Sequence, residues 1–126
     1  MSGNLIFDTN VIIDSAKGNK KASNFLESVD TVVISVMTAF ELFEGCLNSH
    51  ELATTENAVE SFEIINVDER ISIIALEIFR NNKLKYGISI GDSLIAATAL
   101  SRNLVLVTMN TKHFNFIEEL KIIKPY

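Results

Sequence analysis

Three acidic residues of this sequence stand at or near the start of a helical pattern. Asp8 directly follows the first apolar run, and Glu41 comes six residues after a second run that closes at Ser35. Asp92 opens an almost wholly apolar helix. In open α/β sheets, ligands bind in the crevice outside the carboxyl ends of the strands. We therefore expect these acids to face one crevice, with Asn110, just past a third run, as a further oxygen donor.

Such a set of oxygens suits a divalent cation. Mg²⁺ prefers oxygen ligands and is typically held by a few carboxylates together with water and substrate phosphate. A bound ion lowers the pKa of its water, orients a scissile phosphate and neutralises charge on the leaving oxygen. The basic residue nearest to Asp8 is Lys17, and none lies between Lys85 and Arg102 around Asp92. Clustered carboxylates without a cation repel one another, and a metal would relieve that repulsion.

A second interpretation of the same acids needs no metal. Aspartate is a favoured N-cap, so Asp8 could simply cap the helix that follows it. Thr38-x-x-Glu41 and Ser89-x-x-Asp92 match the capping-box pattern, the second with Asp in place of the usual Glu. Helix dipoles also favour acids in a first turn. Spacing alone leaves the metal site and the caps open as alternatives.

Apolar runs and helical periodicities alternate along the chain, which is the pattern of an α/β sandwich around a mostly parallel sheet. Continuous apolar runs are typical of buried parallel strands. In Glu69–Tyr86, an apolar stripe at helical spacing ends before Gly87, the expected stop signal. We expect strands at residues 4–8, 31–35, 103–108 and, more weakly, 120–124, and further helices at 22–27, about 38–48, around 52–62 and 93–101.

Length and composition predict one globular domain that spans residues 1–126. The chain is 48% hydrophobic with one proline and five glycines, which excludes disordered and low-complexity classes. A single cysteine, Cys46, excludes an intramolecular disulfide and favours a reducing, cytoplasmic location. The longest uncharged apolar-rich stretch, Thr31–Phe40, is far short of a membrane span, and residues 1–4 carry no basic segment typical of a signal peptide.

The net charge of −5 argues against a nucleic-acid partner, because phosphate binding usually draws on a basic surface. The distribution of charged residues along the chain weakens that objection. No lysine or arginine occurs between Ala22 and Glu69, so the basic residues all lie in the flanking segments. They could form one surface that meets phosphates, or a set of solvated helix faces; the sequence leaves both open.

Four segments resemble the motifs of the PIN-domain family, and within it the VapC-like toxins of prokaryotic toxin–antitoxin pairs. They agree in order, spacing and total length, and the likeness covers nearly the whole chain. The segments are FDTNVIID at residues 7–14, ISVMTAFELFEG at 34–45, GDSLIAATA at 91–99 and LVTMNTKHF at 106–114.

The resemblance implies a three-layer α/β/α fold with a short, mostly parallel sheet. It implies an endoribonuclease that uses Mg²⁺ or Mn²⁺ to cut single-stranded or loop RNA, often as a homodimer inhibited by a small antitoxin. By position, the metal-binding acids are Asp8, Glu41 and Asp92. Asn110 matches a fourth catalytic position where many relatives carry Asp, which removes one charge that a second ion would use. Polar residues around that pocket are matched by Thr9, Asn10 and Thr108, our candidates for substrate binding.

Two other functions remain as alternatives. An inactive PIN-like module that only grips RNA or a protein is favoured by Asn110 and the negative net charge. Phosphoryl transfer through an aspartyl intermediate at Asp8 is disfavoured, because such enzymes typically place a second acid where Asn10 stands.

Other residues offer weaker signals. His113 could touch RNA, but beside Phe114 a packing role is the commoner one. Cys46 is expected in the core. Phe40, Phe43 and Phe79 fall at helical spacing, so we interpret them as core or dimer contacts rather than as platforms for RNA bases.

Overall fold

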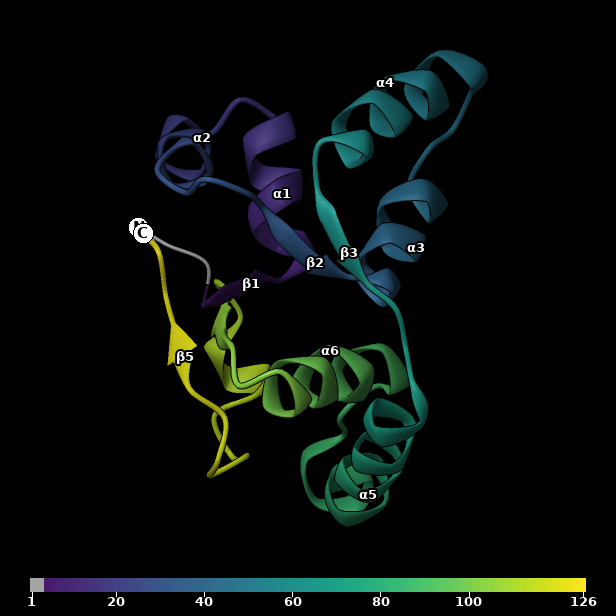
Figure 1. The fold of residues 1–126 in the computed structure, drawn as a ribbon, viewed down its shortest axis with the longest axis vertical. Coiled ribbons are helices and arrows are strands. Elements are labelled where there is room, and N and C mark those ends of the chain that lie inside the picture. The colour runs from purple at the N-terminus through teal and green to yellow at the C-terminus, as the bar shows by residue number, and fades with distance from the viewer. Residues whose placement is uncertain (1–3) are drawn as a thin grey trace.

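A computed structural model describes residues 4–126, in which strands and helices alternate (Figure 1). The strands are β1 (Leu5–Phe7), β2 (Val33–Ser35), β3 (Glu63–Ile65), β4 (Val105–Val107) and β5 (Ile122–Ile123). The helices are α1 (Thr9–Ala16), α2 (Lys20–Glu27), α3 (Val36–Glu44), α4 (Ser49–Glu60), α5 (Glu69–Tyr86) and α6 (Ile90–Ser101), with a 3₁₀ turn η1 at Thr111–His113.

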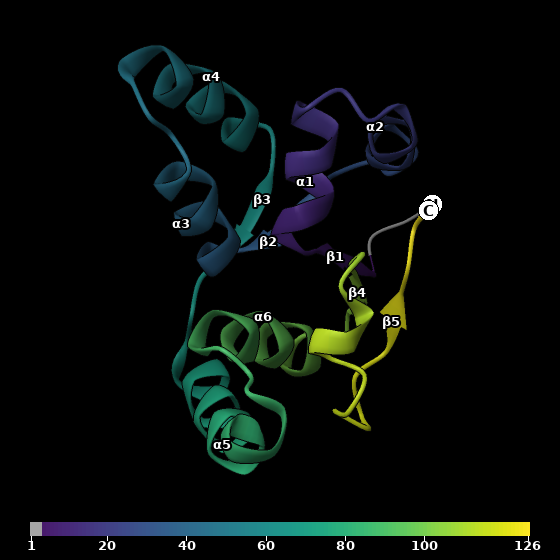
Figure 2. The same cartoon turned by 180° about the vertical axis from the view of Figure 1, so that it is seen from behind.

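The strands form one layer made of two hydrogen-bonded groups. β1, β4 and β5 pair in parallel in that order, and β2 pairs in parallel with β3. β2 packs beside β1, which brings the two groups together. Helices α1 to α4 lie on one side of this layer and α5 and α6 on the other, as Figures 1 and 2 show. The three-layer α/β/α fold and its parallel sheet are thus confirmed.

Successive residues of each strand point to opposite faces, and both faces are buried. In β1, Ile6 packs against α5 and α6, whereas Leu5 and Phe7 pack against α1 and α2. Leu106 and Val107 of β4 divide in the same way between the two cores. This two-sided burial explains why the strands appear as continuous apolar runs rather than alternating ones.

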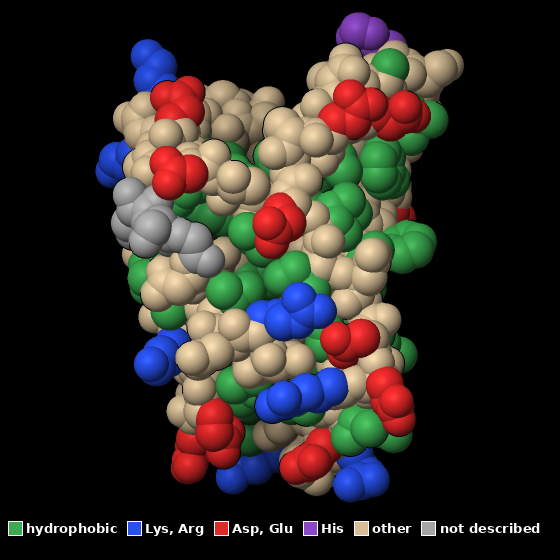
Figure 3. Space-filling view, in the orientation of Figure 1, with side chains coloured by type: hydrophobic (Ala, Val, Ile, Leu, Met, Phe, Trp, Pro, Cys, Tyr) green, Lys and Arg blue, Asp and Glu red, His purple; other side chains and the backbone are tan. Residues whose placement is uncertain are grey.

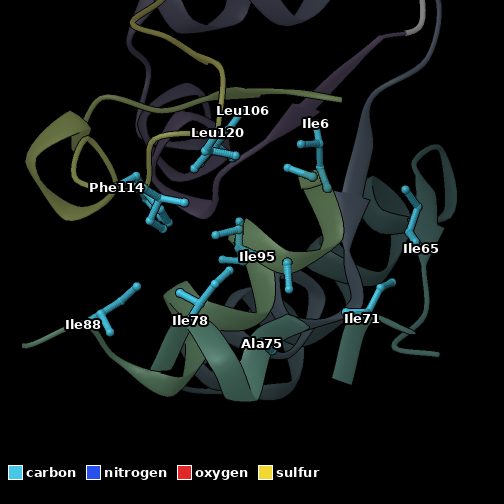
Figure 4. Close-up of a cluster of buried hydrophobic side chains, with 14 of the residues drawn as sticks. Ile6, Ile65, Ile71, Ala75, Ile78, Ile88, Ile95, Leu106, Phe114 and Leu120 are labelled. Atoms are coloured by element: carbon cyan, nitrogen blue, oxygen red, sulfur yellow. The ribbon is translucent and has the colours of Figure 1, made fainter. Parts of the chain in front are cut away.

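The core between the sheet and helices α5 and α6 holds the first turn of α6, which carries Asp92, in place (Figure 4). Ile95 of α6 and Ile71 of α5 have no exposed surface, and neither has Phe114, which follows η1. Alanines at 96, 97 and 99 are also fully buried, which lets α6 pack closely against its neighbours. The first turn of α6 is therefore fixed relative to the ends of β1 and β4.

α6 is mostly apolar, yet it has only 12 residues. A helix needs about 20 residues to cross a bilayer. Within residues 4–126, no helix is both long and apolar enough to do so.

Most predicted elements are present, with shifted ends. The four predicted strands occur in shorter form, and α5 has the predicted bounds. The helix expected to run to about residue 48 ends at Glu44, before Gly45. β3 was not predicted, because its three residues include an acid and are mostly exposed, unlike the buried apolar runs of the other strands.

The predicted capping box Thr38-x-x-Glu41 is wrong. The N-cap of α3 is Ser35, whose Oγ accepts a hydrogen bond from the Met37 amide at 3.0 Å. Thr38 is fully buried inside the helix. Glu41 consequently lies in the second turn of α3, and its carboxylate takes no part in capping that helix.

Ile95→Ala should destabilise the chain by about 2–5 kcal/mol, because it removes apolar contacts and leaves a cavity in a fully buried site. Ile73→Ala on the neighbouring helix α5 is the matched control, since that side chain is 61% exposed. Urea unfolding of both variants measures the difference. Equal midpoints for the two variants would contradict the core described here.

Candidate active site

Asp8 lies directly after β1 and is 5% exposed. Its Oδ1 accepts a hydrogen bond from the Thr9 amide at 2.8 Å, so it does cap α1 as one of the two interpretations predicted. Its Oδ2 accepts from the Thr108 hydroxyl at 2.7 Å and from the Asn10 side-chain amide at 3.0 Å. Asp8 is therefore more than a cap, because groups from the end of β4 also hold its carboxylate in one orientation.

Asn10 joins the ends of β1 and β4. Its Nδ2 donates to Asp8, and its Oδ1 accepts from the Met109 amide at 3.2 Å. Thr108 Oγ1 lies 3.3 Å from the same Nδ2 and also accepts from the Asn110 amide at 3.0 Å. The loop after β4 is thus tied to the acid at the end of β1, and the exposed side chain of Asn110 stands beside this network.

Glu41 is held by a threonine from another helix. The Thr9 hydroxyl donates to Glu41 Oε1 at 2.6 Å, and Thr9 Oγ1 lies 3.1 Å from the hydroxyl of buried Thr38. Glu41 also lies next to the start of α6, because a Cβ built on Gly91 would come within 3.4 Å of Glu41 Oε2. Glycine at 91 therefore leaves room for this carboxylate beside Asp92.

Glu41 also lines a surface hollow of about 660 Å³ between α1, α3 and α4. The hollow is bordered by Lys17 and His50 as well. Glu41 can therefore be reached from solvent, although Asp8 is buried.

Asp92 lies in the first turn of α6, where the Ser89 hydroxyl accepts a hydrogen bond from its amide at 3.0 Å. The predicted N-cap at Ser89 is thus present. The Asp92 carboxylate is only 20% exposed and is turned toward a different partner: its Oδ2 lies 3.2 Å from His113 Nδ1. His113, which sequence patterns favoured as a packing residue, is 56% exposed and pairs with a candidate metal ligand.

The acids are close enough to disturb one another. Burial raises the pKa of Asp8 above its usual value, against the lowering effect of its three hydrogen bonds and of His113. Burial also raises the pKa of Asp92, and the charges of Asp8 and Glu41 raise it further, while His113 lowers it. The charges of Asp8 and Glu41 thus act on Asp92, although the three acids come from separate parts of the chain.

Comparison with known proteins identifies the family. Residues 5–119 match the PIN domain. The chain belongs to the PIN-domain family. It is 36% identical over 118 residues to Ribonuclease VapC1 of Methanocaldococcus jannaschii, covering 91% of this chain and 82% of the relative. It is 31% identical over 121 residues to Ribonuclease VapC10 of Mycobacterium tuberculosis, covering 93% and 90%.

Solved PIN-domain structures have the same fold over nearly the whole chain. A toxin–antitoxin complex from Klebsiella pneumoniae superposes with a TM-score of 0.82 at 32% identity, covering 98% of both chains. VapBC-1 from nontypeable Haemophilus influenzae gives a TM-score of 0.80 at 29% identity, also covering 98% of both. This chain is a VapC-like member of the PIN-domain family.

The donor chemistry of the PIN-domain acids fits a hard divalent cation, since all three side chains offer carboxylate oxygens. Their side chains do not close around a single point, because in the described part of the chain no three acid, histidine or cysteine side chains are placed to hold a metal. Glu41 Oε1 accepts a hydrogen bond from the Thr9 hydroxyl, and Asp92 Oδ2 lies beside His113 Nδ1.

One other expectation needs correction. Cys46 is not in the core; it is half-buried on the wall of the hollow, with its Sγ 3.2 Å from the Thr55 hydroxyl. Of the phenylalanines expected as core or dimer contacts, Phe79 packs against the core beneath α6. Phe40 is 67% exposed, so it is not a core residue, and a dimer contact stays the prediction for it. Helical spacing predicts which side chains share one face of a helix. It does not predict whether the rest of the protein covers that face.

Asp92→Asn should raise the Tm of the metal-free protein by a few degrees at neutral pH, because it removes a charge that burial and two other acids disfavour. Since the folded-state pKa lies above the ordinary 3.8, the native state binds this proton more readily than the unfolded chain. The gain should therefore vanish toward pH 4 and grow as pH rises through the raised pKa.

Thermal unfolding in EDTA at several pH values measures this, with Asp30→Asn, an exposed aspartate, as the control. A lower Tm for Asp92→Asn at neutral pH would show that its bond to His113 outweighs the repulsion.

Proposed function

We propose that this chain is a metal-dependent endoribonuclease, the toxin of a toxin–antitoxin pair, and that Asp8, Glu41 and Asp92 hold Mg²⁺ or Mn²⁺. The observation that carries the proposal is the gathering of three carboxylates at one edge of the sheet, where the charges of Asp8 and Glu41 raise the pKa of Asp92. Relatives named Ribonuclease VapC, matched over almost the whole chain, support the reaction class.

The residues around the acids have positioning roles. Thr108, Asn10 and the Thr9 amide donate to Asp8 and so favour its ionised form, which is the form that binds a cation. Such partners of a ligand fix its orientation and tune its affinity. Thr9, Asn10 and Thr108 remain our candidates for substrate binding, and their side chains also bond to polar groups of the site.

A bound Mg²⁺ or Mn²⁺ would supply a more acidic water and neutralise charge at the scissile phosphate. Asn110 contributes a neutral, exposed amide at the mouth of the site, whose NH₂ group can donate a hydrogen bond to a phosphodiester oxygen without adding repulsion. With an Asn there, three carboxylates are available, and we propose a single ion.

The rest of the proposal concerns assembly. Several structural neighbours are toxin–antitoxin complexes, including VapBC from Salmonella typhimurium bound to DNA, which supports a small antitoxin as partner of this chain. We also propose one domain over residues 1–126, a homodimer and a cytoplasmic location.

Purified protein should cleave RNA with Mg²⁺ or Mn²⁺, and Asp8→Asn should reduce the rate by roughly a hundredfold or more, since losing even an outer-shell partner of a metal ligand typically costs 10–100-fold. Gel analysis of a structured RNA measures the cleavage. Glu44→Gln, an exposed acid on the helix of Glu41, is the matched control and should cleave normally. Full activity in EDTA would refute metal dependence.

Thermal unfolding with and without Mg²⁺ distinguishes an enzyme from an inactive module without any RNA. It compares the wild-type chain with the Asp8→Asn variant. Mg²⁺ at a hundred times its Kd should stabilise the wild-type chain by about 2.7 kcal/mol and leave Asp8→Asn unchanged. An inactive scaffold would show the same Tm with and without the ion.

Expression of this chain alone should arrest bacterial growth, and co-expression of a small protein encoded beside it should restore growth. The Asp8→Asn variant should not arrest growth but should still co-purify with that protein. Arrest by Asp8→Asn at equal expression would separate toxicity from RNA cleavage.

A further inference from the structure

Two aromatic rings stack on the surface beside the candidate active site. Tyr86, the last residue of α5, and Phe116 lie with ring centroids 4.2 Å apart and planes 6° from parallel. Phe116 is partly buried against the core, while Tyr86 is 48% exposed. The pair therefore presents an aromatic ring to solvent on a well-supported base.

Both rings are fixed by buried neighbours. Gly87, in a left-handed conformation with φ +67°, turns the chain after Tyr86 so that Ile88 enters the core. Phe116 lies between Phe114 and Ile117, which are 0% and 7% exposed. A flat ligand that stacks on the Tyr86 ring displaces the side chain of exposed Lys85, whose Nζ lies over that ring, while Phe116 supports the ring from its other contact.

Positive charge accompanies the pair. Lys85 Nζ lies 5.2 Å from the centroid of the Tyr86 ring, within cation–π range. Lys83 is exposed on the same last turn of α5, and Lys112 is exposed on η1. The region over α3 and α4, in contrast, shows acids and no lysine or arginine on the face in Figure 3, as the sequence of residues 22–69 requires.

The stacked pair lies on the same two segments as one of the site acids. Residues 86–92 run from Tyr86 to Asp92, and residues 113–116 run from His113 to Phe116. These segments are joined by the Asp92–His113 contact at 3.2 Å and by the Tyr86–Phe116 stack. The aromatic pair is thus held on the same two segments as Asp92, and Phe116 is three positions from His113 along the chain. A nucleic-acid strand with its phosphate at the acids passes this part of the surface.

From these observations we infer that Tyr86 and Phe116 form a stacking platform for one base of single-stranded RNA beside the cleaved bond, and that Lys85 contacts the adjoining phosphate. The inference rests on the proposed ribonuclease function. Stacking suits a protein of net charge −5, because it supplies affinity that does not depend on a large basic surface. It also requires an unpaired base, since a duplex leaves no free base face.

Intrinsic fluorescence tests the platform directly. The chain has two tyrosines and no tryptophan, so Tyr126→Phe leaves Tyr86 as the single fluorophore for tyrosine emission. Tyr126 itself donates a hydrogen bond to Asp14, at 2.7 Å. In a Tyr126→Phe/Asp8→Asn chain without divalent ions, a short single-stranded RNA should quench the emission saturably. Blunt duplex RNA and inorganic polyphosphate should not; equal quenching by polyphosphate would overturn the proposal.

Substitution gives an independent measurement. Tyr86→Ala should weaken binding of the single-stranded RNA roughly 5- to 150-fold, the range typical for loss of one base stack, and Tyr86→Phe should restore it. In the active chain Tyr86→Ala should raise KM and leave kcat nearly unchanged. Unchanged affinity in a folded Tyr86→Ala chain contradicts the platform. If that variant does not fold, the quenching titration still decides, since it leaves the pair intact.

Lys85→Gln should lower the slope of log Kd against log salt by about 0.7, the value expected for one lost phosphate contact on a single strand. Lys124→Gln, a lysine near the C-terminus, is the control and should leave the slope unchanged. The two proposals fail separately. RNA cleavage that survives Asp8→Asn removes the proposed catalytic role, whereas unaltered binding by Tyr86→Ala removes only the platform.

Discussion

The charge repulsion that Asp8 and Glu41 exert on Asp92 is the constraint on which the rest of this structure depends. Burial opposes the ionisation of Asp8 and of Asp92, and the two neighbouring acids oppose that of Asp92 further. The fold offsets that cost with donors: hydroxyls from Thr9 and Thr108, an amide from Asn10 and the ring of His113. In the described part of the chain, no buried side-chain nitrogen or oxygen lacks a partner.

The positions of those donors follow from the sheet. β1 and β4 are parallel neighbours, so Asp8 and Thr108 leave the sheet at the same edge and can bond although they are a hundred residues apart. α3 and α6 then bring Glu41 and Asp92 to that edge from opposite layers. Hydrophobic cores on both faces of the sheet hold this edge rigid. The core beneath α5 and α6 is rich in isoleucine, leucine and alanine, and a second core lies on the opposite face. The rigidity of the surrounding cores is what allows like charges to be held together.

Two of the three carboxylates have a polar partner from another segment. Glu41 accepts a hydrogen bond from the Thr9 hydroxyl, and Asp92 Oδ2 lies beside His113 Nδ1. His113 lowers the pKa of Asp92, against the raising effects of burial and of the charges on Asp8 and Glu41. A loop histidine beside a core phenylalanine gave little reason to expect this contact.

The sequence by itself determined the layers of the fold and the identity of the acids. Apolar runs, the stripe of α5 and its glycine stop are local signals, and they predicted all the strands except β3 and the positions of the helices. β3 escaped because two of its three residues face solvent, so it has no apolar run to detect. The motif residues around Asp8, Glu41, Asp92 and Asn110 were likewise identified from the sequence, by the order and spacing of four segments that resemble PIN-domain motifs.

Only the tertiary structure decided which groups meet. That Thr9 bonds Glu41, that His113 reaches Asp92, and that Tyr86 stacks on Phe116 depend on contacts between residues 32, 21 and 30 positions apart in the sequence. Local periodicity carries no information about such pairs, since a hydroxyl or a ring has the same sequence signature whether it is solvated or paired. The sheet order and the packing of α5 against α6 bring these segments together, and so they decide which polar and aromatic residues belong to the site.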